Sequence, residues 1–249
     1  FPSIEEWSPD SLQFDPESFI YKKTVGLIKY LSSESNGRYF VAMPEVCGNL
    51  DALAHLRGSE NVLMDILVDP EPVLDALDKI QEVWKETIDL IYDIVRETNE
   101  GGSCVGWLYT WAPGLHNQMY SDISVMLSPE SFQKFVYPEL AEQSNHLDFP
   151  LYHLDGFQQT RHLDMICSIE NLKMIQWTNV AGEPSPVHFI PTFKKIQEAG
   201  KGLLLHVSIR DIETLMENLS SKGLYLVVNA RDREEADYAM KKIARFTHD

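Results

Sequence analysis

The sequence predicts an α/β protein whose parallel strands close into a (β/α)8 TIM barrel. From residue 149 onward, short apolar strands alternate with amphipathic helices, which is typical of a parallel sheet covered by helices. The length of 249 residues is long for one open sheet and usual for one barrel. No linker, low-complexity tract or internal repeat interrupts the chain. We therefore expect a single domain over residues 1–249.

Helices are predicted where apolar residues recur every three or four positions. Three helices share one kind of start, in which a capping side chain precedes proline and glutamate: Asp15-Pro16-Glu17, Asp69-Pro70-Glu71 and Ser128-Pro129-Glu130. The capping side chain accepts a backbone hydrogen bond, and proline suits the first helical position. The predicted helices cover about residues 15–31, 49–56, 60–68, 69–97, 128–146, 160–167, 191–199, 211–221 and 233–245.

Short apolar runs predict six strands. A barrel has eight, so two strands are either unrecognised or missing from the sequence. The chain starts at Phe1 rather than at methionine, and residues 1–14 have the pattern of an irregular lead-in. We therefore expect that an N-terminal part of the barrel precedes Phe1. The predicted strands are residues 39–43, 104–110, 149–154, 174–177, 202–207 and 224–228.

Composition excludes several classes of protein. The formal net charge of −17 disfavours nucleic acid and anionic membranes as partners, because phosphate binding requires clustered lysine and arginine. No run of about 18 apolar residues is present, and no leader peptide is recognisable. The three cysteines are odd in number and lack CxxC spacing. We expect free thiols and a cytoplasmic location.

Polar or large aromatic residues stand at or after the end of every predicted strand. Barrel enzymes carry their catalytic groups at the C-terminal ends of the strands, so we expect these side chains to line one pocket. The residues in question are Glu45, Trp111 with Asp122, His153 with Asp155, Trp177 with Glu183, His206 with Ser208, and Asn229 with Arg231.

The centre of this predicted pocket is the segment His153-Leu154-Asp155-Gly156. Side chains two residues apart on a strand point the same way, so His153 and Asp155 share a face. Gly156 allows a sharp turn or a close approach to a ligand. Imidazole and carboxylate together can bind a divalent metal such as zinc, or carry out acid–base steps. The sequence leaves both roles open.

Each of these residues also has a purely structural interpretation. His153 and His206 could be core histidines bonded to other groups, and Asp155 could cap a helix. Glu183 could be a solvated loop acid. Trp111 and Trp177 could be packing residues, as most tryptophans are. The recurrence of such residues at all six strand ends favours the functional interpretation. No Gly-rich phosphate loop, GxSxG or HExxH motif is present.

Several motifs in sequence order are similar to those of the uroporphyrinogen decarboxylase superfamily. Residues 48–58 (GNLDALAHLRG) and 63–71 (LMDILVDPE) resemble its glycine-containing strand exit and the following helix start. Residues 121–130 (SDISVMLSPE) with 135–138 (FVYP) resemble its loop-and-helix motif. Residues 153–156 stand where the family has His-x-Cys-Gly. The resemblance extends from about residue 39 to the C-terminus, and it implies a TIM barrel.

The superfamily contains two main activities, and the resemblance implies one of them. One is cofactor-free decarboxylation of uroporphyrinogen in porphyrin biosynthesis. The other is zinc-dependent methyl transfer between a corrinoid protein and a small thiol or methyl donor. The decarboxylase stretch Arg-Gln-Ala-Gly-Arg-Tyr is absent, and its polycarboxylate substrate would need basic residues. The methyltransferase zinc cysteines are replaced by Asp155 and, at the distal position, by Asn229, so a zinc site here would be weaker.

We expect an enzyme of the methyltransferase type that acts with a corrinoid protein on a small methylated compound. His153 and Asp155 would bind zinc or polarise the substrate, and Asp122 would act as an acid or charge anchor. Glu45, Trp111, Trp177, Glu183 and His206 are the expected substrate-binding residues. Aromatic and acidic walls would suit a methylated cation. The alternatives are uroporphyrinogen decarboxylase, with Asp122 stabilising protonated pyrrole, and a non-catalytic ligand-binding barrel.

Overall fold

A computed structural model describes residues 7–249 of the chain. The chain forms two compact units. Unit 1 ends at Pro150, and unit 2 covers Leu151–Asp249. The expected lead-in, residues 1–14, lies partly outside the described residues, and its described part contains one 3-10 turn at Pro9–Ser11. The prediction that residues 1–249 form one domain stays a prediction.

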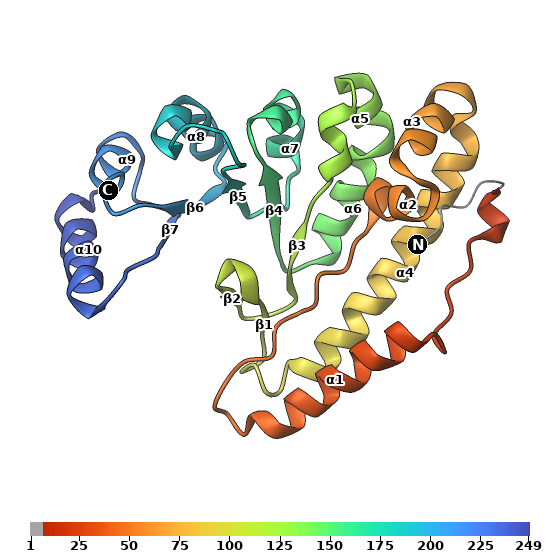
Figure 1. Cartoon of the computed structure of the whole chain (residues 1–249), viewed down its shortest axis with the longest axis horizontal. Coiled ribbons are helices and arrows are strands. Elements are labelled where there is room, and N and C mark those ends of the chain that lie inside the picture. The colour runs from red at the N-terminus through yellow and green to blue at the C-terminus, as the bar shows by residue number, and fades with distance from the viewer. Residues whose placement is uncertain (1–6) are drawn as a thin grey trace. The chain divides into compact units, whose positions relative to one another are not determined.

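Unit 1 is built mainly from helices around α4. The buried stripe of α4 includes Val73, Trp84 and Ile88, and it packs against α1, α2, α3 and α6. Figure 1 shows α1 running alongside α4. As predicted, α4 begins at Asp69-Pro70, but among the described residues the side chain of Asp69 makes no capping hydrogen bond. The helices of this unit are α1 (Phe19–Ser35), α2 (Asn49–Arg57), α3 (Ser59–Val68), α4 (Pro70–Val95), α5 (Pro129–Phe135) and α6 (Tyr137–His146).

Two helices of unit 1 differ from the prediction. The first begins at Phe19 rather than at Asp15, because Asp15 accepts a hydrogen bond from the backbone of Glu17 in a turn that precedes the helix. The predicted helix 128–146 is divided into α5 and α6 beside Pro138. Proline lacks the N–H group that a continuous helix would need there, but it is accommodated in the first turn of α6.

The strands of unit 1 are short. The predicted strand 104–110 is instead an antiparallel pair, β1 (Ser103–Val105) and β2 (Thr110–Ala112), separated by the 3-10 turn Gly106–Leu108. The predicted strand 39–43 is an extended segment in which the side chain of Asn99 bonds both backbone groups of Val41. A strand that was not predicted, β3 (His116–Met119), is followed by the 3-10 helix η3 (Asp122–Met126).

Unit 2 has the predicted alternation of parallel strands and helices (Figure 1). All four predicted strands of this region are confirmed. The strands are β4 (Phe149–Asp155), which begins at the end of unit 1, β5 (Met174–Thr178), β6 (Gly202–Val207) and β7 (Leu224–Val228). The helices are α7 (Leu163–Ser168), α8 (Ile190–Glu198), α9 (Ile212–Asn218) and α10 (Arg233–Phe246), with 3-10 helices at Phe157–His162 and Pro186–Phe189.

The larger sheet confirms an α/β fold. Its order is β3-β4-β5-β6-β7, and the pairs β4–β5, β5–β6 and β6–β7 are parallel. Because this order is linear, residues 7–249 do not contain a closed eight-stranded ring. The parallel strands are nevertheless joined by helices, as in the repeating unit of a barrel.

The two faces of the unit 2 sheet have different environments. Tyr152 on β4 pairs with Ile175 on β5, which pairs with Leu203 on β6, and all three are fully buried. This apolar face is the core of the unit, and α8 packs on β6 there. The neighbouring positions along the strands must point to the opposite face. That face carries the polar residues discussed below.

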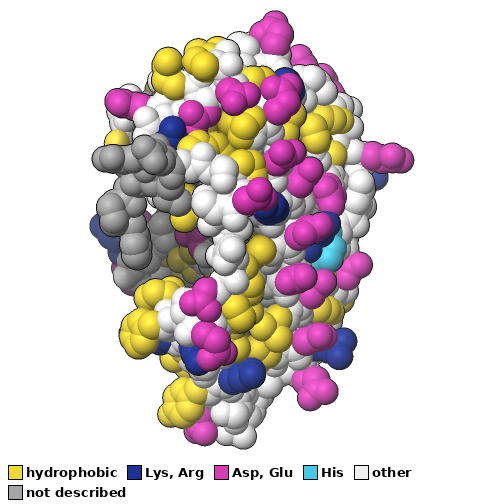
Figure 2. All heavy atoms as spheres, turned by 90° about the vertical axis from the view of Figure 1, so that its right-hand side faces the viewer, with side chains coloured by type: hydrophobic (Ala, Val, Ile, Leu, Met, Phe, Trp, Pro, Cys, Tyr) yellow, Lys and Arg dark blue, Asp and Glu magenta, His cyan; other side chains and the backbone are white. Residues whose placement is uncertain are grey.

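The surface carries the negative charge expected from the sequence. Figure 2 shows Asp and Glu side chains spread over one face, with fewer Lys and Arg between them. No helix within residues 7–249 combines the length and apolar character that crossing a membrane requires.

Candidate functional site

A row of polar side chains lies on the second face of the unit 2 sheet. His153 pairs with Gln176 in the register of β4 and β5, and Asp155 pairs with Thr178 two residues further on. Gln176 pairs with Leu204 of β6, so His206, two residues after Leu204, faces the same side. Parallel strands therefore bring His153, Asp155 and His206 to one face near their C-terminal ends, which is where α/β proteins bind ligands. Five polar residues lie on this side of the sheet, and we call them the polar face: His153, Asp155, Gln176, Thr178 and His206.

The ring of His153 is held in a defined orientation. Its Nδ1 atom lies 2.5 Å from Oε1 of Gln176, and the amide nitrogen of Gln176 donates to Oγ1 of Thr178 at 2.9 Å. Since the amide oxygen only accepts, Nδ1 must carry the proton. The lone pair of the imidazole is then on Nε2, which is the nitrogen that can ligate a metal or accept a proton.

Burial lowers the pKa of His206, because a charged ring is poorly solvated inside the protein. This imidazole is therefore neutral at neutral pH. The polar face offers two imidazoles, from His153 and His206, and one carboxyl group, from Asp155.

The loop after β4 confirms the expected role of glycine. Gly156 has a φ of +82°, a left-handed conformation that favours glycine. A side chain at this position would also meet Glu183 Oε1 and Val180 Cγ1, each 3.0 Å from its Cβ. The backbone N–H of Asp155 is bonded to the side chain of Gln159 at 3.1 Å. The end of β4 is thus held by the hydrogen bond at Asp155 and by the close packing at Gly156.

Glu183 joins the loops that follow β4 and β5. One carboxylate oxygen accepts the N–H of Phe157 at 2.8 Å, and the other accepts the N–H of Val180 at 3.2 Å. Both oxygens therefore bond to the backbone of unit 2. The geometry assigns Glu183 a structural role, in place of the expected contact with substrate.

Replacing Glu183 with alanine should loosen these two loops. The exposed N–H of Phe157 and the partly buried N–H of Val180 would both lose a charged acceptor. Leaving a buried N–H group unsatisfied costs about 1–3 kcal/mol, so most of the loss arises at Val180. We expect faster hydrogen exchange at Phe157 and Val180 than in the wild-type protein, as measured by NMR. Replacing the exposed Glu198 with alanine is the matched control. Unchanged exchange at both amides would contradict the assignment.

Trp177 lies on the apolar face and not on the polar face. Its ring packs 4.8 Å from Phe189 and 5.3 Å from Phe193, measured between ring centroids. It is 1% exposed. The expectation that Trp177 walls the pocket with His153 does not fit this placement, because its neighbour Gln176 takes the position that faces His153.

The other predicted site residues, Glu45, Trp111 and Asp122, belong to unit 1. Glu45 and Asp122 are exposed. Trp111 is half-exposed in β2, where its indole N–H donates to the carbonyl of Asn99 at 3.0 Å and its ring stacks on Phe40. That one pocket contains these three residues together with those of unit 2 stays a prediction.

Glu45 and Asp122 are close enough to Cys47 to influence its titration. Burial raises the pKa of Cys47 to about 11, and the charges of Asp51, Asp122 and Glu45 raise it further, against a hydrogen bond with Tyr120. The Cys47 thiol is therefore neutral and is not an activated nucleophile.

Two residues of the polar face, Gln176 and Thr178, and one buried carboxyl group of unit 1, that of Asp51, were not predicted from the sequence. Asp51 is buried in the first turn of α2 and accepts the N–H of Ile123 at 2.9 Å, which ties α2 to η3. Burial raises its pKa. Gln176 and Thr178 complete the polar face. One signal could have identified Gln176. It is a glutamine inside the apolar run of β5, and a buried amide needs a hydrogen-bond partner.

The residues present do not form a complete metal site. Within residues 7–249, no group of three or more His, Cys, Asp or Glu side chains is placed to hold a metal ion. Catalytic zinc normally has three protein ligands. His153 and Asp155 supply two, so the geometry of the described residues does not fit the expected zinc ion.

Comparison with known proteins gives a likeness of fold. No family model matches the sequence. No curated protein matches it either. Among solved structures, a methyltransferase from Methanosarcina mazei is similar, with a TM-score of 0.58 at 11% sequence identity, over 99% of this chain and 70% of that one. The chain is methyltransferase-like in fold. At this identity the likeness concerns the fold alone.

Proposed function

We propose that this protein is a methyltransferase that moves a methyl group between a small methylated compound and a corrinoid protein, on a barrel of the uroporphyrinogen decarboxylase type. The observation that carries the proposal is the fixed orientation of His153 on the polar face, with Nδ1 bonded to Gln176. The fold likeness to a methyltransferase is consistent with it. So are the sequence motifs that resemble the superfamily.

The proposed chemistry requires one proton transfer. When the methyl group passes from a donor CH3–X to the corrinoid, the corrinoid would supply the electron pair of the new bond to carbon. The C–X bond breaks with both electrons remaining on X, and X takes up a proton. In the opposite direction, the acceptor H–X loses that proton as the new C–X bond forms. The Nε2 lone pair of His153 accepts the proton in this direction, and the resulting imidazolium returns it in the other. Gln176 holds the ring for both steps.

Acidic side chains would favour a positively charged methyl donor. Asp155 lies on the same face as His153, and a carboxylate attracts a methylated ammonium group. The predicted donor-binding residues of unit 1 are Asp122, Glu45 and Trp111. The acidity of Asp122, Glu45 and Asp155 disfavours the alternative, porphyrinogen decarboxylation, whose substrate carries many carboxylates.

Replacing His153 with glutamine should abolish most of the activity. General acid–base catalysis contributes roughly 10²–10⁴-fold, and glutamine preserves hydrogen bonding but can neither donate nor accept the transferred proton. The assay follows the absorbance change when cob(I)alamin becomes methylcobalamin in the presence of mono-, di-, tri- or tetramethylated ammonium. We expect wild-type protein to catalyse a saturable conversion with at least one of these donors.

The matched control is replacement of the exposed His188 with glutamine, which makes the same chemical change outside the polar face. We expect its rate to remain within about twofold of wild type, since distant surface changes are nearly neutral. Equal rates for the His153 variant and wild type would contradict the proposal. Saturable binding of a methylated ammonium without methyl loss would favour the non-catalytic ligand-binding barrel.

A further inference from the structure

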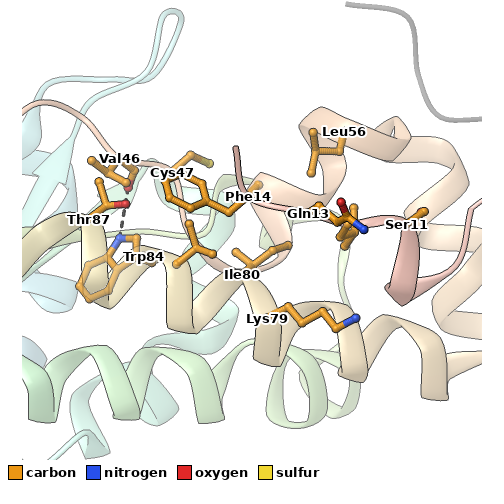
Figure 3. Close-up of a pocket in the computed structure, with 13 residues that line it drawn as sticks. Ser11, Gln13, Phe14, Val46, Cys47, Leu56, Lys79, Ile80, Trp84 and Thr87 are labelled. Atoms are coloured by element: carbon orange, nitrogen blue, oxygen red, sulfur yellow. Dashed lines mark hydrogen bonds between the residues drawn. The ribbon is translucent and has the colours of Figure 1, made fainter. Parts of the chain in front are cut away.

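Unit 1 contains a cavity that the proposed function does not use. Its volume is about 350 Å³, and Figure 3 shows side chains from four parts of the unit around it. These parts are the segment before α1, the extended segment before α2, α2 itself and α4. The lining residues are Ser11, Leu12, Gln13, Phe14, Val46, Cys47, Ala52, Leu56, Lys79, Ile80, Val83, Trp84 and Thr87.

Most of the wall is apolar. Its polar side chains include Gln13 and Thr87, whereas those of Ser11, Lys79 and Trp84 are hydrogen-bonded to other parts of the chain. The indole N–H of Trp84 donates to the carbonyl of Val46 at 3.3 Å (Figure 3). The one charged lining residue, Lys79, donates to the carbonyl of Pro9 at 2.9 Å and to Asp10 at 3.2 Å. Neither Pro9 nor Asp10 lines the cavity. The ammonium group is thus bonded to residues outside the cavity.

The thiol of Cys47 contributes no charge either. Burial raises its pKa to about 11, so it is protonated at neutral pH and behaves as a small apolar group. The backbone beside it is closely packed, since a Cβ on Gly48 would lie 2.9 Å from Cδ1 of Trp84. The wall between Cys47 and Trp84 therefore has a defined shape.

The size and chemistry of this cavity indicate a particular kind of occupant. Water needs two to four polar partners, which this wall provides poorly. An apolar cavity of about 150 Å³ already binds benzene, so this larger one has room for a two-ring molecule. Small-molecule sites are typically concave and mostly apolar, with volumes from about 300 Å³.

We propose that this cavity binds a neutral apolar small molecule of about the size of naphthalene, between Phe14, Cys47 and Trp84. Removing the ligand's surface from water supplies the affinity, and the exposed aromatic ring of Phe14 supplies a flat contact, with the edge of the buried Trp84 beside it. A charged ligand would lose its hydration without gaining a partner in the wall, so it is excluded.

The test uses the cysteines of the full-length protein as reporters. Cys47 lines the cavity, whereas Cys167 lies in unit 2 with similar partial exposure and a pKa also raised to about 11. Alkylation by N-ethylmaleimide is followed at each cysteine by mass spectrometry, with and without naphthalene. At naphthalene concentrations of about four times its Kd, Cys47 should react roughly fivefold more slowly, and Cys167 at an unchanged rate.

A pair of variants and a charged ligand complete the test. Replacing Ala52 with phenylalanine fills the cavity, and we expect naphthalene to have no effect on Cys47 in this variant. Replacing Ala141 on α6 with phenylalanine is the matched control, which should keep the protection. Naphthalene-2-sulfonate carries a charge and should not protect Cys47 in wild-type protein.

Three results would overturn the proposal. They are an unchanged Cys47 rate with naphthalene in wild-type protein, equal protection by the sulfonate, and retained protection in a folded Ala52→Phe protein. The first two require no variant, so the proposal can be refuted even if Ala52→Phe does not fold.

Discussion

Replacing Glu139 with glutamine is expected to remove a large pH dependence from the stability of unit 1. Glu139 is 6% exposed on α6, and within residues 7–249 its Oε2 atom has no hydrogen-bond partner. Burial, followed by the charges of Glu142 and Asp78, raises its pKa from 4.5 to about 8, against a lowering by Lys85. The carboxyl group is therefore protonated in the folded protein at neutral pH.

The direction of the effect follows from comparing the folded and unfolded states. Below pH 4.5 both states are protonated, and stability from this group is fully present. Between pH 4.5 and about 8 the unfolded chain releases the proton while the folded chain keeps it, so stability falls as pH rises. Above about pH 8 both states are ionised and the loss levels off. At about 1.4 kcal/mol per pKa unit, the total loss is of the order of 3–5 kcal/mol.

Glutamine cannot ionise, so the variant should gain stability over wild type as the pH rises from 5 to 9. The measurement is urea unfolding at several pH values, followed by tryptophan fluorescence, since four of the five tryptophans belong to unit 1. Replacing the exposed Glu86 on α4 with glutamine is the control and should change stability by less than about 0.5 kcal/mol at each pH. Parallel pH profiles for wild type and the Glu139 variant would contradict the assigned burial.

The sequence predicted unit 2 better than unit 1, and the reason is physical. Strands β4, β5 and β6 are largely buried, and each of these strands, like the more exposed β7, is a short apolar run that can be recognised without its neighbours. By contrast, β3 consists of His116, Asn117, Gln118 and Met119, and its polar residues are buried only because they find partners. His116, for example, has Nδ1 2.6 Å from the carbonyl of Phe149. Such partners are not visible in a local pattern.

The turn between β1 and β2 was missed for a related reason. Tyr109 has a φ of 56° there, a left-handed conformation that a tyrosine rarely adopts and that no glycine or asparagine signals. The apolar run around it therefore resembled one continuous strand. The segment at Val41 also has the composition of a strand, but its backbone is bonded by the side chain of Asn99.

For the candidate site, the sequence could predict which residues of one strand share a face, but not which residues of neighbouring strands lie opposite one another. A period of two correctly placed His153 and Asp155 on the same face, because that relation needs no other strand. Which residue of β5 faces His153 depends on the register between β4 and β5, which the sequence does not reveal. That register brings Gln176 to His153 and turns Trp177 away. The error over Trp177 and the omission of Gln176 thus have one cause.

Replacing Trp177 with alanine should strongly destabilise unit 2. The indole is fully buried between Phe189 and Phe193, and removing a large buried aromatic ring leaves a cavity that costs about 3–5 kcal/mol. The measurement is hydrogen exchange of the β4 to β6 backbone, which should become faster throughout these strands. Replacing Trp111 with alanine is the control, because that ring is 41% exposed and its loss should cost far less.

A second variant at this position, Trp177→Phe, separates packing from substrate binding. If Trp177 were a wall of the substrate pocket, its replacement with phenylalanine would raise KM and leave unfolding almost unchanged. From its position on the apolar face, we expect the reverse: a loss of stability of about 1–2 kcal/mol, with KM unchanged for any methylated donor that the wild-type protein uses. A raised KM at wild-type stability would mean that Trp177 faces the ligand, and the register that places Gln176 beside His153 would then be wrong as well.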